Sequence, residues 1–468
     1  MLDILDSDPT ATVSSSNGGA NTTFDAVSID TRSIQRGELF VALKGQNVDG
    51  AVFVNDALTR THGAVITRDY AQQQNVQAGS TIITVDDTLR TLQSLARHLR
   101  VKTALNVIGI TGTNGKTTTK EMTARVLEKR FMVLKTKGNL NNHIGLPLTL
   151  TSMDRHDVAV LEMGASRRGD IQQLCEIASP DIGIITNIGP GHLEGFGSIE
   201  SVRAGKLELM DSAMGLIANA DDRFLMEAVL DKNNQLSSTM RKRVITYALH
   251  SRADITARII NEVRPAAAMG KDDLTPTLRA EVRLPDGGVR EMVLNVAGAF
   301  NLYNALAALC AGHLMGVDVD DALAALTEFK GIAMRLEIRK HRGATVLYDV
   351  YNANPASMME AVKELVRLRT SRAIAVVGDM LELGPFSKEK HSELGRWMSQ
   401  LPVDVLIAVG ESMKITTQEF IHHRGEGCQA YHAKDCLSAR EILNDIISVD
   451  DAILIKGSRS NKMETILE

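Results

Sequence analysis

One glycine-rich segment ends in lysine and threonine, the residue types that bind nucleotide phosphates and their metal ion. Its residues are Thr111, Gly112, Thr113, Asn114, Gly115, Lys116 and Thr117. Glycines let backbone N–H groups point at phosphate oxygens, the lysine meets the β- and γ-phosphates, and the threonine hydroxyl can ligate Mg²⁺. An apolar run at 106–110 precedes the segment and a helix-compatible run at 118–129 follows it. We therefore predict an ATP-binding loop with Lys116 as its catalytic cation, although only two residues separate its glycines where the common phosphate loop has four.

Three further side chains belong to the same predicted edge of a parallel sheet. Glu162 ends the apolar strand 158–161, and His192 lies in a loop rich in glycine and proline that follows the strand 183–186. Carboxylate oxygens suit Mg²⁺, and an imidazole can ligate a cation or bond a phosphate. Lys206 faces this crevice if its predicted helix, 199–210, runs back along the sheet. The alternatives are a glutamate that caps the next helix, an exposed loop histidine and a solvated lysine.

The elements that position these residues alternate between strand and helix, which predicts an α/β fold with three domains. We predict a small α/β domain over 1–100, a central P-loop domain with a parallel sheet over 101–328, and a Rossmann-like domain over 329–468. The expected helices include 53–60, 89–99, 301–315 and 357–368. The expected strands are 39–43, 64–67, 81–85, 106–110, 132–134, 158–163, 183–186, 215–218, 345–348, 373–377, 405–409 and 452–455. An antiparallel patch is expected within 244–293, and the polar stretch 8–23 is expected not to order by itself.

Composition excludes several classes of protein. The 468 residues carry a formal net charge of −5 and 44% hydrophobic residues, so no polycationic surface favours nucleic acid. The four cysteines show no CxxC spacing, which argues against zinc and against a disulfide framework. No run of about 18 apolar residues occurs, and the N-terminus is acidic where a secretory signal is basic. We expect a cytoplasmic protein that does not insert into a membrane and binds a small nucleotide.

Ten segments resemble the Mur ligases of peptidoglycan synthesis, and together they span nearly the whole chain. They are SIDTR (28–32), GELFVALKG (37–45), TGTNGKTTTKEM (111–122), GNLNNHIGLPLTL (138–150), LEMGA (161–165), HLEGFGS (192–198), FNLYNALAA (300–308), YNANPASM (351–358), VVGDMLELG (376–384) and KGSR (456–459). The phosphate loop alone indicates the superfamily. The YNANP and GDMLELG segments resemble the member that adds D-alanyl-D-alanine.

The resemblance implies two Mg²⁺ sites beside the phosphate loop. It places Thr117 and Glu162 on one ion and His192 on the second, and it makes Lys206 the lysine that family members carboxylate. Carbamate formation needs a neutral amine, which desolvation and nearby cations favour. The modification converts a positive side chain into an anion that can bind metal.

The same resemblance implies the nucleotide contacts. Asn301 and Asn304 correspond to the asparagines that contact adenine; otherwise Asn301 is simply a helix N-cap. Arg335 corresponds to a residue that reaches the γ-phosphate, and Asp349 to one that reaches the ribose. Tyr348 departs from the pattern, because the family usually has a second acidic residue there.

The implied reaction joins D-alanyl-D-alanine to UDP-N-acetylmuramoyl-tripeptide through an acyl phosphate, with ATP as the source of phosphate. Thr31 is expected to contact the uridine nucleotide, and three residues are expected along the muramoyl part: Asn139, Asn142 and Ser166. We expect a monomer. Neither the third residue of the tripeptide, meso-diaminopimelate or lysine, nor the carboxylation of Lys206 follows from the sequence.

Four other functions are weighed against this one. The family member that adds a diamino acid has an Asp-Asn-Pro-Arg motif with no match here, and a folylpolyglutamate synthetase would lack a uridine-nucleotide domain. A P-loop NTPase that acts as a switch would hydrolyse ATP without an amino-acid substrate. A binding module without catalysis disagrees with the intact Lys116, Glu162 and His192. The chain also opens with a short polar segment where many family members have a helix-rich one, which leaves the edge of the first domain open.

Overall fold

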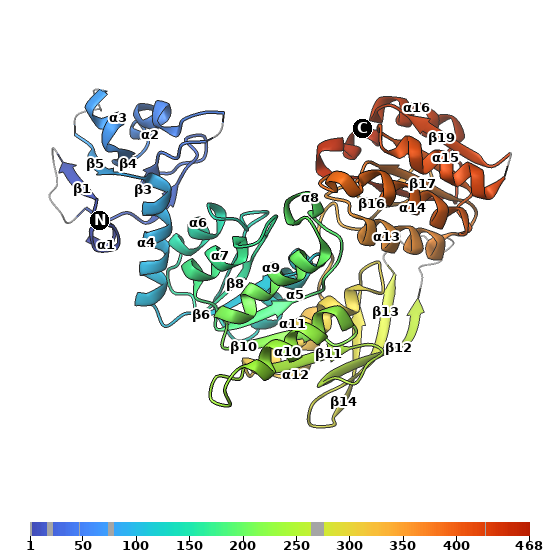
Figure 1. The fold of residues 1–468 in the computed structure, drawn as a ribbon, viewed down its shortest axis with the longest axis horizontal. Helices are drawn as coiled ribbons and strands as arrows, with labels where there is room; N and C mark the ends of the chain where they lie inside the picture. Colours follow the sequence, from blue (N-terminus) through green and yellow to red (C-terminus); the bar gives the residue numbers. More distant parts are fainter. Residues whose placement is uncertain (1, 16–21, 46, 74–78, 264–275, 426) are drawn as a thin grey trace.

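The computed structural model contains three β-sheets, each formed by a continuous part of the chain. It describes residues 2–15, 22–45, 47–73, 79–263, 276–425 and 427–468. Figure 1 shows the N-terminal sheet at one end of the long axis, the C-terminal sheet at the other, and the nine-stranded sheet between them. This is the three-part α/β architecture that the sequence predicts. The exact boundaries after residues 100 and 328 stay predictions.

The first sheet has five strands in the order β1-β5-β4-β3-β2, and only β1 is antiparallel to its neighbour. The strands are β1 (Thr12–Ser15), β2 (Ala26–Ser28), β3 (Glu38–Val41), β4 (Gly63–Thr67) and β5 (Thr81–Val85). The helices are α1 (Leu2–Ser7), α2 (Val54–Leu58), α3 (Arg68–Gln73) and α4 (Thr88–Lys102). The helix predicted over 53–60 is shorter: a 3-10 turn, Gly50–Phe53, precedes α2.

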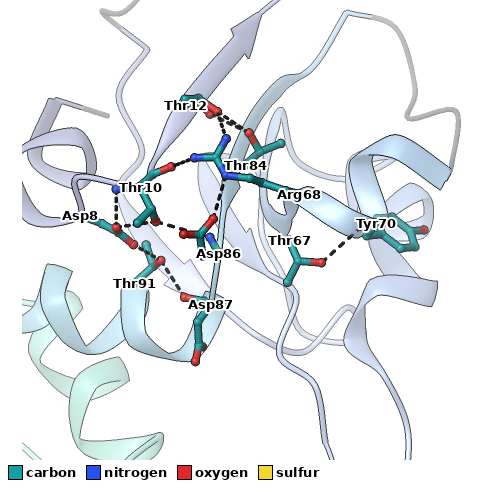
Figure 2. Close-up of polar contacts among 10 residues, drawn as sticks. All are labelled: Asp8, Thr10, Thr12, Thr67, Arg68, Tyr70, Thr84, Asp86, Asp87 and Thr91. Carbon is teal, nitrogen blue, oxygen red and sulfur yellow. Dashed lines mark hydrogen bonds and ion pairs between the residues drawn. The ribbon is translucent and has the colours of Figure 1, made fainter.

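The polar N-terminal stretch is more ordered than predicted. We expected the stretch 8–23 not to order by itself, but β1 pairs with β5, and residues 16–21 lie outside the described residues. Figure 2 shows the reason: the Arg68 guanidinium donates to the Thr10 carbonyl, to the Thr12 hydroxyl at 3.2 Å and to the Asp86 carboxylate at 2.8 Å. Asp8 is buried and accepts from Thr10. The prediction was wrong over 8–15 because Thr10 and Thr12 lie more than 50 residues from Arg68 in the sequence and leave no local signal.

The central sheet has nine strands in the order β14-β13-β12-β11-β10-β9-β6-β8-β7. They are β6 (Asn106–Thr111), β7 (Val133–Lys135), β8 (Val158–Glu162), β9 (Ile182–Ile185), β10 (Gly215–Asn219), β11 (Arg243–Ala248), β12 (Ile255–Val263), β13 (Thr277–Arg283) and β14 (Val289–Leu294). Along this order, neighbouring strands from β12 to β7 are parallel to one another. Strands β12, β13 and β14 pair in antiparallel fashion. The predicted antiparallel patch is thus confirmed, but it starts at β12, because β11 continues the parallel part.

Helices cover both faces of this sheet. They are α5 (Lys116–Leu127), α6 (Gly145–Thr151), α7 (Asp170–Ala178), α8 (Leu193–Phe196), α9 (Ile199–Ser212), α10 (Arg223–Gln235), α11 (Asn301–Leu314) and α12 (Val319–Thr327). Helix α5 begins two residues earlier than the predicted 118–129, because Gly115 in the left-handed conformation is its N-cap. Helix α4 joins the first two cores: Leu92 and Leu95 pack in the first, and Ala96 packs in the second.

The third sheet has six strands in the order β15-β16-β20-β17-β18-β19, and only β15 runs antiparallel. The strands are β15 (Glu337–His341), β16 (Ala344–Asp349), β17 (Ala373–Gly378), β18 (Val405–Val409), β19 (Gln429–Ala433) and β20 (Ala452–Lys456). The helices are α13 (Pro355–Leu368), α14 (Ser387–Ser399), α15 (Met413–Arg424) and α16 (Cys436–Ile446), with 3-10 turns at Gly384–Phe386, Arg459–Asn461 and Met463–Ile466. Every residue of β17, β18 and β20 is buried, as expected for parallel strands covered on both faces.

None of the helices in the described ranges is long and apolar enough to span a membrane. The feature that matters for chemistry is the carboxyl edge of β6, β8 and β9, which are adjacent and parallel. The loops after these three strands meet at this edge, so residues from distant parts of the sequence lie together there.

Replacing Arg68 with alanine should release β1 from the first sheet. The change removes three hydrogen bonds from one guanidinium, at a cost of about 1 to 3 kcal/mol in the free energy of unfolding. Hydrogen exchange of the amides at 10–15 should accelerate, while exchange in β17 and β18 stays unchanged. The exposed neighbour Gln72→Ala is the control. Unchanged exchange at 10–15 in Arg68→Ala would contradict this account of the N-terminal segment.

Candidate active site

The loop between β6 and α5 is shaped by two glycines with positive φ. Gly112 has a φ of +145° and Gly115 a φ of +82°, a region that L side chains rarely adopt. A Cβ on Gly112 would collide with the Thr186 hydroxyl, and one on Gly115 would collide with the side-chain oxygen of Asn304. The loop therefore lies directly against these two side chains, where a residue other than glycine has no room.

The loop after β9 fixes this glycine-rich loop in place. The backbone N–H of Thr113 donates to the Asn187 carbonyl at 2.9 Å, and that of Asn114 donates to the Asn187 side-chain oxygen at 3.0 Å. The Thr186 hydroxyl and the Asn187 amide donate in return to the Asn114 carbonyl, at 2.6 and 3.0 Å. The predicted phosphate loop is thus preorganised by bonds from the loop after β9, about 70 residues later in the sequence.

Lys116 starts α5 and lies at this edge, partly buried. Its Nζ donates to the carbonyls of Gly112 and Thr113 at 3.0 and 3.1 Å. Desolvation lowers the pKa of the Lys116 ammonium, the nearby Glu162 carboxylate opposes that shift, and Arg335 adds to it. A lysine in this environment gains from any anion that enters the site.

Glu162 ends β8 and is 3% exposed. Its Oε1 accepts from the Asn141 side chain at 2.8 Å, whereas the buried Oε2 has no hydrogen-bond partner among the described residues. An unpaired buried carboxylate oxygen is costly, and a hard cation satisfies it. Glu162 and Thr117 both line the same cavity, so the residues present fit a Mg²⁺ ion.

Lys206 lies on α9 and is 2% exposed. Among the described residues its Nζ bonds only the Ala165 carbonyl, at 3.5 Å, and it lies 5.5 Å from the centre of the Phe196 ring. Burial, and secondarily the positive charge of Lys116, lower the pKa of Lys206 far below its ordinary value. Its amine is therefore neutral far more readily than that of an exposed lysine.

The third domain contacts the phosphate loop at two points. An Arg335 guanidinium N–H donates to the Thr117 hydroxyl at 3.0 Å, and the guanidinium lies over the Tyr351 ring at 4.1 Å. The Asn354 amide donates to the Asn114 side-chain oxygen at 2.8 Å. Asn354 is also the N-cap of α13, so this helix begins against the loop.

Two further polar pairs lie beside these contacts. His192 Nδ1 is 2.6 Å from the Glu382 carboxylate, which joins the loop after β9 to the third domain. Lys456, at 2% exposure, donates to the Asp349 carboxylate at 2.6 Å and to the Asn352 carbonyl at 2.8 Å. Asp349 therefore carries a buried cation as its partner, where the sequence suggested only that an acidic partner is missing at Tyr348.

One cavity of about 1550 Å³ brings most of the predicted site together. The predicted residues that line it are Thr113, Asn114, Gly115, Lys116, Thr117, Asn139, Asn142, Glu162, Ser166, His192, Asn301, Asn304, Arg335 and Asp349. Four predicted residues do not line it: Thr31, Thr111, Gly112 and Lys206. Thr111 and Gly112 instead support the loop, and the Thr31 carbonyl, in the first domain, accepts from Arg60 at 2.7 Å.

Asn301 and Asn304 form a small amide chain at the start of α11. The Asn304 amide donates to the Asn301 side-chain oxygen at 2.8 Å, and the Asn301 amide donates to the Ala297 carbonyl at 2.7 Å. The Asn304 oxygen accepts from Thr119 on α5 at 3.1 Å. The alternative of a simple N-cap at Asn301 is wrong, because the N-cap position is Phe300.

Three family descriptions match successive parts of the chain: "Mur ligase family, catalytic domain" at 23–100, "Mur ligase middle domain" at 110–312, and "Mur ligase, glutamate ligase domain" at 334–459. A UDP-N-acetylmuramoyl-tripeptide–D-alanyl-D-alanine ligase of Bacillus subtilis is 33% identical over 454 residues, covering 96% of this chain and 93% of the relative. The chain belongs to the Mur ligase family.

Solved Mur ligase structures agree with this assignment over almost the full length. MurF from Acinetobacter baumannii superposes with a TM-score of 0.81 at 28% identity, covering 94% of this chain and 92% of that one. MurF from Thermotoga maritima, solved in complex with ADP, gives a TM-score of 0.77 at 28% identity and covers 95% and 96% of the two chains. The resemblance drawn from the ten sequence segments is confirmed.

Sequence reasoning missed four residues of this Mur ligase site: Asn141, Asn354, Glu382 and Lys456. Each lies inside a segment that carried the family resemblance, so a signal was present. What the sequence lacked was the partner, since Glu382 meets His192 and Asn354 meets Asn114 only after the third domain packs on the second.

Replacing Lys206 with methionine should stabilise the protein at pH 7. The apolar side chain removes the cost of desolvating a buried amine, and we expect a gain of about 1 to 3 kcal/mol in the free energy of unfolding. The folded pKa lies below the unfolded value near 10.5, so the wild type loses its penalty as pH rises toward 10.5 and the gain should shrink.

Chemical denaturation at pH 7, 8.5 and 10, in buffer depleted of carbon dioxide, measures this gain. The exposed Lys388→Met is the matched control and should change little at any pH. A Lys206→Met protein that is less stable than the wild type, or a gain that does not depend on pH, would contradict the burial argument.

Proposed function

We propose that this protein is an ATP-dependent, ADP-forming ligase that joins D-alanyl-D-alanine to UDP-N-acetylmuramoyl-tripeptide, giving the pentapeptide precursor of peptidoglycan. The observation that carries the proposal is the single cavity in which the phosphate loop, Glu162, His192 and residues of the third domain converge. Full-length relatives that carry this enzyme's name support the choice of substrates.

The chemistry is activation of a carboxylate. The terminal carboxylate of the tripeptide attacks the γ-phosphorus of ATP, the bond to the β-phosphate oxygen breaks, and ADP leaves. The neutral amine of D-alanyl-D-alanine then attacks the acyl carbon, inorganic phosphate leaves, and the nitrogen loses one proton as the amide forms. Lys116 and Arg335 bind the transferring phosphoryl group and neutralise the charge that it carries.

Mg²⁺ would be held by Thr117 and Glu162, with His192 beside a second ion. When bound, the metal supplies Lewis-acid stabilisation of the phosphate oxygens. The unpaired Oε2 of Glu162 supports this assignment. The Arg335 guanidinium, now on the Thr117 hydroxyl, is placed to exchange that contact for a phosphate oxygen.

Lys206 is the proposed site of carboxylation. The reaction adds carbon dioxide to a neutral amine with release of one proton, and its product is a carbamate anion. Burial and the neighbouring Lys116 charge keep the Lys206 amine neutral, which supports the modification. The resulting anion would remove the repulsion between the two lysines.

The remaining predicted substrate contacts come from all three domains. Asn301, Asn304 and Asp349 are proposed for adenine and ribose, since they line the cavity beside the phosphate loop. Asn139, Asn142 and Ser166 line its other part and are proposed for the muramoyl peptide. Thr31 is proposed for the uridine nucleotide, outside this cavity.

We further propose that the enzyme acts as a monomer in the cytoplasm. The precursor substrate is made there in the relatives' pathway, and the four cysteines are free thiols in the structure. Size-exclusion chromatography with light scattering tests the monomer.

ADP release and product mass test the function directly. The purified protein with Mg²⁺ and ATP should form ADP and the pentapeptide only when both UDP-N-acetylmuramoyl-tripeptide and D-alanyl-D-alanine are present. Lys116→Ala should lower turnover at least about 100-fold, because it removes a cation from the transferring phosphoryl group. ATP hydrolysis that is independent of both substrates would instead favour a switch-type NTPase. Tripeptides ending in meso-diaminopimelate and in lysine, assayed side by side, identify the preferred third residue.

A further inference from the structure

The segment 378–384, GDMLELG, is a rigid loop of the third domain that the proposed chemistry leaves unused. Its backbone is held on several sides: the Met380 N–H donates to His391 Nε2 at 3.2 Å, and the Leu381 N–H donates to the Ser458 hydroxyl at 2.9 Å. Met380 and Leu383 are each 1% exposed. His391 is itself fully buried and is anchored to the Ser387 carbonyl at 2.7 Å. The loop backbone therefore has little freedom to move.

Glu382 projects from this loop onto the second domain. Its carbonyl accepts from the Glu194 N–H at 3.0 Å, and its carboxylate lies 2.6 Å from His192 Nδ1. Both Glu382 and His192 are in the left-handed conformation, with φ of +61° and +53°. This conformation is unfavourable for residues other than glycine, so a residue keeps it only where the surrounding structure requires it.

We infer that Glu382 is a positioning residue that fixes the tautomer and direction of the His192 imidazole in the active site. A carboxylate accepts only, so the neutral imidazole must carry its proton on Nδ1 to make this contact. Nε2 then keeps its lone pair, and among the described residues it has no hydrogen-bond partner. His192 lines the cavity, so this lone pair is available to a cation or to a proton on a substrate.

The place of Glu382 in the fold agrees with this role. The Glu382 carboxylate and the His192 imidazole meet across the contact between the third and second domains, at 2.6 Å. Because Glu382 and His192 belong to different domains, the direction of the imidazole depends on how the third domain packs on the second. The inference rests on the proposed function only for what His192 meets in the cavity.

The tautomer can be read without substrates by NMR of protein labelled with ¹⁵N-histidine, at a pH where the imidazole is neutral. His192→Gln assigns the resonances. In the wild type, His192 should show a protonated Nδ1 and an unprotonated Nε2. Glu382→Ala should shift the population toward a protonated Nε2. Glu382→Gln should keep the wild-type tautomer, because the amide oxygen still accepts.

A matched control and a metal measurement complete the test. Glu389→Ala removes an exposed carboxylate of the same domain, which pairs within the described ranges only with Lys390, and it should leave the His192 resonances unchanged. Titration of Mn²⁺ into the ATP complex should show an affinity about 10- to 100-fold weaker in Glu382→Ala than in Glu389→Ala.

A wild-type His192 with its proton on Nε2, or an unchanged tautomer in Glu382→Ala, would overturn the inference. If the wild-type imidazole carries its proton on Nδ1 and Glu382→Ala shifts that proton, the inference is supported even if His192 ligates no metal. In that case the proposed function fails and the positioning role stands. If Glu382→Ala does not fold, the Nδ1 proton in the wild type and in Glu382→Gln still decides the question.

Discussion

The site depends on partly or fully desolvating two lysine amines and one carboxylate at the same sheet edge. Desolvation lowers the pKa of both Lys116 and Lys206, and neighbouring charges also shift each pKa. Glu162 is buried, and one of its carboxylate oxygens has no hydrogen-bond partner in the part of the chain that the structure describes. Such groups reduce the stability of the protein alone, and they gain from a polyphosphate and its cation. Stability is therefore exchanged for affinity toward a charged nucleotide.

The frame that holds these charges is a parallel sheet with a preorganised loop. Gly112 and Gly115 allow the loop to lie against Thr186 and Asn304, where no side chain has room. The loop after β9 then fixes its backbone through Asn187. Because the loop and Lys116 are already in position, little reorganisation is needed when charge develops on a phosphoryl group.

The third domain completes this frame through a few directional contacts. Arg335 reaches Thr117, Asn354 reaches Asn114, and Glu382 reaches His192. All three are polar pairs between side chains that lie near the cavity, so a change in the seating of the domain alters the phosphate loop and the histidine together. This coupling gives the enzyme a physical means to join nucleotide binding to the arrival of the acceptor amine.

The sequence was sufficient where the signal is local. Strand, glycine loop and helix around Lys116, and the apolar strands that end in Glu162 and precede His192, predicted the sheet edge correctly. It was insufficient where a partner lies far along the chain. The strand β1 depends on Arg68, and the partner of Asp349 is Lys456, 107 residues later. The spacing of polar residues carries no information on such pairs before the chain folds.

The most direct test of the central claim follows an oxygen atom from the tripeptide. An acyl phosphate forms when a carboxylate oxygen bonds to the γ-phosphorus, and that oxygen leaves with the phosphate when the amine attacks. With a tripeptide labelled with ¹⁸O in its terminal carboxylate, the account predicts one ¹⁸O atom in each inorganic phosphate released, measured by mass spectrometry or ³¹P NMR. Phosphate that contains only ¹⁶O, released during pentapeptide formation, would contradict it.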